Sequence, residues 1–137
     1  MDTLAFKTHL LATCYMLGLI WFVQVVHYPL MGKVPAQAFV GYERLHTRYT
    51  SWVTAPPMLL ELGTGLWLLL QFPGHLLLWG NAVGLLWLWA STFFIQVPLH
   101  NQLSQSFDAV VHRKLVQTNW ARTVVWSIRA LLLLSLW

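Results

Sequence analysis

Charged residues are scarce in this chain of 137 residues. Asp, Glu, Lys and Arg together make up 9% of it, whereas soluble globular domains carry about 25%. None of the four occurs between Lys7 and Lys33, or between Glu61 and Asp108. Hydrophobic residues make up 58% of the chain. This composition argues against a soluble domain and is typical of a protein whose solvent is lipid.

Other features are missing as well. Cys14 is the only cysteine, which excludes an intramolecular disulfide and a thiolate metal cluster. The sequence has no glycine-rich phosphate loop and no Gly-x-Ser-x-Gly turn, so it lacks the signatures of nucleotide-binding proteins and serine hydrolases. The net charge of +4 forms no continuous basic patch, and we expect no nucleic-acid partner.

Four apolar stretches remain, and each is about as long as the roughly 20 residues that a transmembrane helix needs. They lie at about 9–29, 52–72, 75–97 and 115–137. We therefore predict an all-α fold, an integral membrane four-helix bundle that forms a single transmembrane domain over residues 1–137.

Basic residues are concentrated in two of the connections between these stretches, those after the first and the third. The residues are Lys33, Arg44, Arg48, Arg113 and Lys114. Cytoplasmic connections carry an excess of Lys and Arg, so both connections are predicted in the cytoplasm and both termini outside.

The first connection has its own periodicity. Pro35 stands at a plausible helix start, and Phe39, Tyr42, His46 and Tyr49 share one helical face through steps of three and four residues. We predict an interfacial helix after the first span, either lying in the membrane interface or running into the second span.

Two segments resemble each other. The letters WFVQV at 21–25 and FFIQV at 93–97 each end an apolar run, and a proline and a histidine follow within a few residues. Two repeated helix pairs would explain the match. A composition shared by membrane helices is the alternative explanation.

Three charges fall inside the predicted spans, where each costs about 2.5–3.5 kcal/mol. Asn119, Arg122, Trp126 and Arg129 form one stripe of the fourth span, which should face inward. Glu61 is the only acid within a span, and an ion pair between Glu61 and Arg129 would pin two helices together. Alternatively, Glu61 is a metal ligand or proton carrier, and the arginines bind an anionic group.

Histidines are the candidate metal ligands. His27 and His100 end the first and third spans on the same membrane face, and His46 approaches that face in a Glu43-x-x-His46 pair, a spacing used by metal sites of helical bundles. With Glu61, they would suit iron, copper, zinc or manganese. Glu43 is a lesser candidate.

The remaining polar residues receive supporting roles. We expect Gln24 and Gln96 to hydrogen-bond the ligands, and Gln24, Gln96 and Arg129 to contact the cofactor. His9, His75 and His112 are predicted to be surface groups.

The segments that carry these residues resemble known proteins. They are His27-Tyr28-Pro29, Leu59-Leu60-Glu61, Ser91-Thr92, Pro98-x-His100 and Asn119-Trp120-x-Arg122. The pattern is similar to a group of short four-span bacterial membrane proteins, and more distantly to the anthrone-oxygenase-like family. The resemblance implies a multi-pass protein of the bacterial inner (cytoplasmic) membrane and supports an oxidative enzyme.

The leading functional prediction is a membrane-embedded metal-dependent enzyme, an oxidoreductase that acts on a lipophilic small molecule near the cytoplasmic face. Its metal ligands would be His27, His46, Glu61 and His100. Arg122 and Asn119 would orient an anionic or carbonyl group of the substrate, and Tyr28 or Tyr42 would supply a proton.

Two alternatives stay open. His27 and His100 would be axial ligands in a haem- or quinone-binding electron carrier. In the other alternative the chain is a non-enzymatic small subunit of a larger membrane complex. The lipid bilayer is the expected partner in every case, and a homo-oligomer is compatible with each of them.

Overall fold

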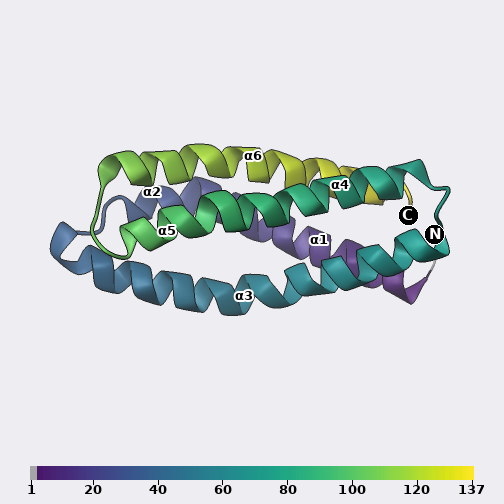
Figure 1. Ribbon diagram of the computed structural model, residues 1–137, viewed down its shortest axis with the longest axis horizontal. Coiled ribbons are helices and arrows are strands. Elements are labelled where there is room, and N and C mark those ends of the chain that lie inside the picture. The colour runs from purple at the N-terminus through teal and green to yellow at the C-terminus, as the bar shows by residue number, and fades with distance from the viewer. Residues whose placement is uncertain (1–2) are drawn as a thin grey trace.

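The chain folds into a bundle of helices (Figure 1). The computed structural model describes residues 3–137, and these residues contain no strand. The elements are α1 (Leu4–Phe22), the π-helical turn η1 (Val23–His27), α2 (Tyr28–Met31), α3 (Ala36–Gln71), α4 (Leu76–Ser91), the π-helical turn η2 (Thr92–Gln96), α5 (Val97–Leu103) and α6 (Ala109–Leu134). The predicted all-α fold is confirmed.

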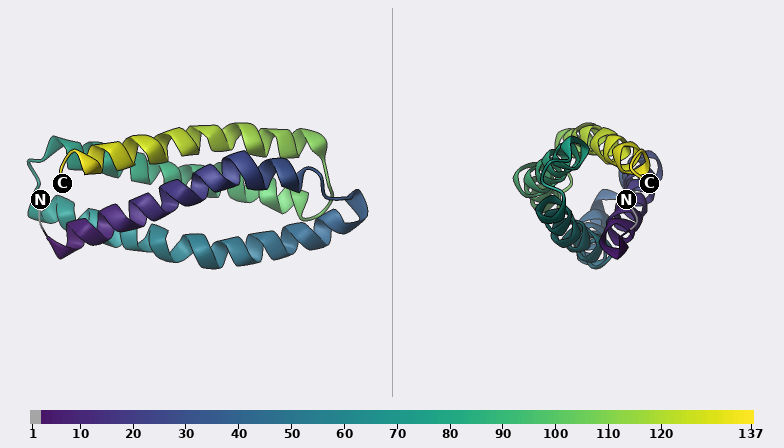
Figure 2. Two further views of the ribbon diagram at one scale, coloured as in Figure 1. Left: turned by 180° about the vertical axis from the view of Figure 1, so that it is seen from behind. Right: turned by 90° about the vertical axis from the view of Figure 1, so that its right-hand side faces the viewer.

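Because η1 joins α1 to α2 and η2 joins α4 to α5 without a break, these elements form four long helices. α1 packs beside α3 and α6, and α4 packs beside the same two helices. The end-on view in Figure 2 shows the resulting square, with the first and third long helices on a diagonal. Both termini lie at one end of the bundle, called here the terminal end. The connections at 32–35 and 104–108 form the other end, the loop end.

Each π-helical turn ends two residues before a proline. The N–H of Tyr28 bonds to the carbonyl of Val23, and the N–H of Val97 bonds to the carbonyl of Thr92. Proline in a regular helix lacks an N–H and clashes with the carbonyl four residues earlier. A widened turn before Pro29 and before Pro98 is therefore compatible with a continuous helix. These turns also coincide with the two similar segments of the sequence, although a repeat of helix pairs stays a prediction.

Of the two arrangements predicted for the helix after the first span, the structure supports the one in which it runs into the second span. α3 runs unbroken from Ala36 to Gln71, so the predicted helix and the second span are one element. No break in the helix separates the two parts, and Pro56 and Pro57 lie inside it without ending it. Hydropathy detects only the apolar part of such a helix, which is why the predicted span began at about residue 52.

Three of the long helices, at Leu4–Met31, Ala36–Gln71 and Leu76–Leu103, are long and apolar enough to cross a membrane. The exposure pattern agrees, because Phe94 is 81% exposed while Glu61 and Arg129 are 0% and 1% exposed. A soluble protein would show the reverse. Among the described residues, α6 does not meet the same criterion, and the fourth span stays a prediction.

Candidate metal centre and adjoining cavity

A cluster of metal-ligating side chains lies near the loop end. Glu43 and His46 project from one face of α3, three residues apart, and His100 comes from α5. Each offers one ligand atom, and these atoms all lie within 4.8 Å of one another. Glu43 is fully buried, whereas the two histidines are half-buried. We call these three residues the loop-end cluster.

His100 is held from both sides of its ring. Nδ1 lies 2.5 Å from Glu43 Oε1, and Nε2 lies 3.1 Å from the Tyr28 hydroxyl. The second carboxylate oxygen, Glu43 Oε2, is buried without a hydrogen-bond partner. A buried acceptor of this kind is costly unless something binds it. The carboxylate therefore has a free oxygen for a further ligand.

His27 supports His46. His27 Nε2 lies 2.9 Å from His46 Nδ1, and their rings stack with centroids 4.4 Å apart. The Thr50 hydroxyl lies 3.1 Å from the same His46 nitrogen, and the Tyr42 hydroxyl lies 3.4 Å from His27 Nε2. His46 Nδ1 is thus engaged, so Nε2 is the nitrogen left for a ligand.

The structure brings together three of the four predicted metal ligands, His27, His46 and His100, but it does not bring Glu61 to them. Roughly 18 residues of α3 separate Glu61 from Glu43, which is about 27 Å along a helix. Glu43 supplies the carboxylate instead. The Glu-x-x-His spacing indicates this residue in the sequence, whereas the cost of burying a charge in a span points to Glu61.

Glu61 belongs to a second buried network, closer to the terminal end. Its Oε1 lies 2.9 Å from Arg129 Nη2 and accepts a hydrogen bond of 2.7 Å from Thr13. The predicted ion pair between Glu61 and Arg129 is confirmed. Arg129 Nε also donates to Asn81 Oδ1 at 3.0 Å. The network joins α1, α3, α4 and α6, so Arg129 lies with Glu61 rather than beside the histidines of the loop-end cluster.

His9 is part of this network, and its prediction as a surface group is wrong. It is 0% exposed, with Nδ1 2.8 Å from the Thr64 hydroxyl and Nε2 2.8 Å from Asn81 Nδ2. The position near a helix end suggested exposure, but the polar network of the bundle begins within two turns of that end. His112, also predicted at the surface, is half-buried, and its Nε2 lies 3.0 Å from the Tyr28 carbonyl oxygen.

Gln24 and Gln96 bind α6 instead of the histidines. Gln24 donates to the Val116 carbonyl and accepts a hydrogen bond of 2.8 Å from Asn119, while Gln96 donates to the Thr118 hydroxyl at 3.0 Å. The predicted hydrogen bonds from these glutamines to the ligands are therefore wrong. Both glutamines lie in π-helical turns, where they attach the first and third long helices to the fourth.

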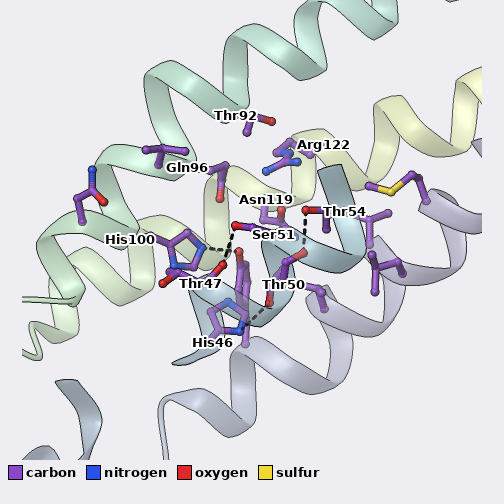
Figure 3. Close-up of a pocket in the computed structure, with 17 residues that line it drawn as sticks. His46, Thr47, Thr50, Ser51, Thr54, Thr92, Gln96, His100, Asn119 and Arg122 are labelled. Atoms are coloured by element: carbon purple, nitrogen blue, oxygen red, sulfur yellow. Dashed lines mark hydrogen bonds between the residues drawn. The ribbon is translucent and has the colours of Figure 1, made fainter. Parts of the chain in front are cut away.

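A cavity of about 290 Å³ adjoins the loop-end cluster. His46 and His100 are on its wall, and so are the three residues predicted to be catalytic, Tyr28, Asn119 and Arg122. In the view of Figure 3, Arg122 lies on the opposite side of the cavity from His46. All four long helices contribute to the lining. The cavity therefore connects the candidate ligands with the residues expected to orient a substrate.

Comparison of the chain with protein-family models, with curated proteins and with solved structures finds no match. The chemistry of the site must be inferred from its own residues.

Proposed function

We propose that the protein is a membrane-embedded metal-dependent enzyme, an oxidoreductase that acts on a small lipophilic substrate. Glu43, His46 and His100 would hold the metal ion, and the substrate would occupy the cavity of about 290 Å³. The observation that carries the proposal is that ligand atoms from two helices, α3 and α5, converge within 4.8 Å at the wall of a cavity.

The donor set fits a transition metal. Two histidines and one carboxylate are the facial ligand set of non-haem Fe(II) oxygenases, and catalytic zinc sites use the same types. Ligands at about 2.0–2.2 Å from an ion lie roughly 3–3.5 Å from each other, so small side-chain movements would suffice. Metal binding would displace the proton between His100 and Glu43, because ligands bind in their deprotonated form.

The chain's own residues would complete the site. A bound transition metal would supply Lewis-acid and redox chemistry, with dioxygen or a quinone as the oxidant class. His27 would orient His46 through their 2.9 Å contact. The Tyr28 hydroxyl, on the cavity wall and 3.1 Å from His100, would hold the proton that moves to or from the substrate.

The membrane arrangement is part of the proposal. α6 would form a fourth span, with Arg122 and Arg129 directed into the bundle, where both are buried. The loop end carries Lys33, Arg44, Arg48, Arg113 and Lys114 and would therefore face the cytoplasm of a bacterial inner membrane.

The haem alternative has less support from the geometry. His46 contacts both proposed axial ligands, with ring centroids 4.4 Å from His27 and 5.3 Å from His100. A macrocycle between His27 and His100 would have to displace His46. The metal-ion proposal requires no such rearrangement.

Metal content provides the test. Protein purified without chelator should contain about one equivalent of a transition metal by elemental analysis. Glu43→Gln and His100→Ala should each reduce the metal affinity by more than tenfold, because each removes one of three protein ligands. His27→Ala, which removes an orienting contact, should cost about 10–100-fold.

His75→Gln is the matched control, since His75 lies in the connection between α3 and α4 at the terminal end, far from the cluster. It should bind metal like the wild type. Equal metal content in Glu43→Gln and wild-type protein would overturn the proposed centre. A Soret band that disappears in His27→Ala would instead identify the site as a haem pocket.

A further inference from the structure

Arg122 is a buried cation without a partner. Arg122 is 8% exposed. Its side chain makes no hydrogen bond and no ion pair with any of residues 3–137. Nε is buried and unsatisfied, and the side chain lines the cavity. A buried charge without compensation is strongly destabilising. Arg129, seven residues later on the same helix, pairs with Glu61 and hydrogen-bonds Asn81. Among the described residues, the bundle therefore contains partners for Arg129 but not for Arg122.

No acidic side chain of the described residues is available to Arg122. Glu43 contacts His100, Glu61 pairs with Arg129, and Asp108 caps the start of α6 through the N–H groups of Val110 and Val111. None of the residues that line the cavity is acidic. The described residues therefore supply no counter-charge for Arg122.

Three hydroxyl groups on the cavity wall already donate their protons to backbone carbonyls. Ser51 donates to the Thr47 carbonyl, Thr54 to the Thr50 carbonyl and Thr92 to the Leu88 carbonyl. The guanidinium group, with five N–H donors in a planar fork, is free to donate into the cavity. Donors without acceptors, on a cation, select an anionic ligand.

One wall of the cavity is apolar. Met16, Leu19, Ile20 and Val23, from α1 and η1, line it. The volume of about 290 Å³ lies at the lower limit of the roughly 300–1,000 Å³ of pockets for drug-sized ligands. The ligand should therefore be small, with one anionic group and an apolar body.

We propose that Arg122 anchors a carboxylate, and that the cavity binds a small carboxylic acid with an aromatic or short aliphatic body. A guanidinium group matches a carboxylate in a bidentate geometry, and a single negative charge balances a single arginine. A phosphate group carries about −1.5 to −2 at pH 7, which would leave excess charge in a site with low dielectric. The inference deepens the proposed function, on which it rests for the reaction, because a carboxylate at Arg122 would place the body of the acid toward His46 and His100.

Binding of benzoate tests the assignment. Wild-type protein in zwitterionic nanodiscs, stripped of metal, is titrated with benzoate and with benzyl alcohol, which has the same ring but no charge. Isothermal calorimetry against empty nanodiscs should show benzoate binding at least tenfold more tightly than the alcohol. Arg122→Met should weaken benzoate binding by about 10–100-fold, and Arg122→Lys should retain part of it.

Arg113→Met is the control, since Arg113 is an exposed arginine on the same helix, and it should bind benzoate like the wild type. Decanoate and inorganic phosphate complete the panel. Decanoate binding at least as tight as that of benzoate identifies a fatty acid from the bilayer as the source of the carboxylate, and exclusion of decanoate identifies a small soluble acid. Equal affinities for benzoate and the alcohol, unchanged binding in Arg122→Met, or preference for phosphate would overturn the proposal.

The proposed metal centre and the proposed carboxylate site can be contradicted independently of each other. Glu43→Gln should lose metal and still bind benzoate, whereas Arg122→Met should bind metal and lose benzoate. Metal-free protein that binds benzoate would support the carboxylate site even if the loop-end cluster binds no ion.

Discussion

At the scale of single residues, two arginines of one helix have opposite surroundings. Arg129 is 1% exposed and bonded to Glu61 and Asn81, whereas Arg122 is 8% exposed and has no partner among residues 3–137. Removing one member of a buried pair leaves an uncompensated charge, while removing an unpaired charge relieves a cost. The two positions therefore separate a structural role from a binding role.

Thermal unfolding in detergent should show this contrast. Arg129→Met should destabilise the protein by about 3–5 kcal/mol, because Glu61 loses its counter-charge. Arg122→Met should stabilise it by about 1 kcal/mol or more, since the methionine keeps much of the apolar stem and removes the charge. If Arg122→Met were as destabilising as Arg129→Met, Arg122 would have a structural partner in the protein, and its assignment as a ligand-binding residue would be contradicted.

The sequence allowed part of this residue-level organisation to be predicted. The cost of charge in lipid pointed to a pair between Glu61 and Arg129, because Glu61 is the only acid within a predicted span. The partners of His9 could not be predicted, since they depend on the relative depth of α1, α3 and α4. Glu43 was recognisable from its spacing to His46, but only packing against α5 shows that it faces His100.

At the scale of the helices, Gly84 allows α4 to approach the buried arginine. A Cβ atom at Gly84 would lie 3.0 Å from both Cγ and Cδ of Arg129, which is tighter than most such contacts. Arg129 has little freedom to move away because Glu61 and Asn81 hold its head group. The absence of a side chain at Gly84 therefore leaves room for the Arg129 side chain in the position that its ion pair requires.

Alanine substitution should distinguish two glycines of α4. Gly84→Ala should destabilise the protein by about 1–3 kcal/mol through overpacking. Gly80→Ala, with no atom within 4 Å of the added Cβ, should stabilise it by about 0.5–1 kcal/mol through helix propensity. Denaturation curves of both variants provide the measurement. A loss of stability in Gly80→Ala, or none in Gly84→Ala, would contradict this account of the helix contact.

Helix number was predictable from apolar run length, but the details of the helices were not. The start of α3 at Ala36 lies in a polar segment that hydropathy does not detect. The turns η1 and η2 leave no periodic signal of their own, although the prolines that follow them mark their positions. In consequence the directions of Gln24 and Gln96 could not be deduced from α-helical spacing.

At the scale of the whole molecule, cysteine labelling tests the number of spans and the orientation. Cys14, the only cysteine, is replaced by serine, and single cysteines are introduced at the exposed positions Gly74, Ser106 and Ser135. An impermeant maleimide added to intact cells should label Gly74→Cys and Ser135→Cys. It should reach Ser106→Cys only after permeabilisation.

Each position tests a different part of the arrangement. Labelling of Gly74→Cys and Ser106→Cys from the same side would contradict a span over Leu76–Leu103. Protection of Ser135→Cys in intact cells, with Gly74→Cys labelled, would show that α6 does not cross the bilayer. The fully reversed pattern would keep four spans and invert the orientation.

The length of α3 affects the compartments from which reactants would reach the loop-end cluster and the cavity. Its 36 residues extend about 54 Å, well beyond the roughly 30 Å hydrocarbon layer of a bilayer. Glu43 and His46 lie in its first three turns, so the loop-end cluster would sit at headgroup level while the cavity reaches toward the acyl chains. Two reactants from different phases could then meet: an apolar one that diffuses laterally out of the lipid, and a water-soluble one that arrives from the aqueous side.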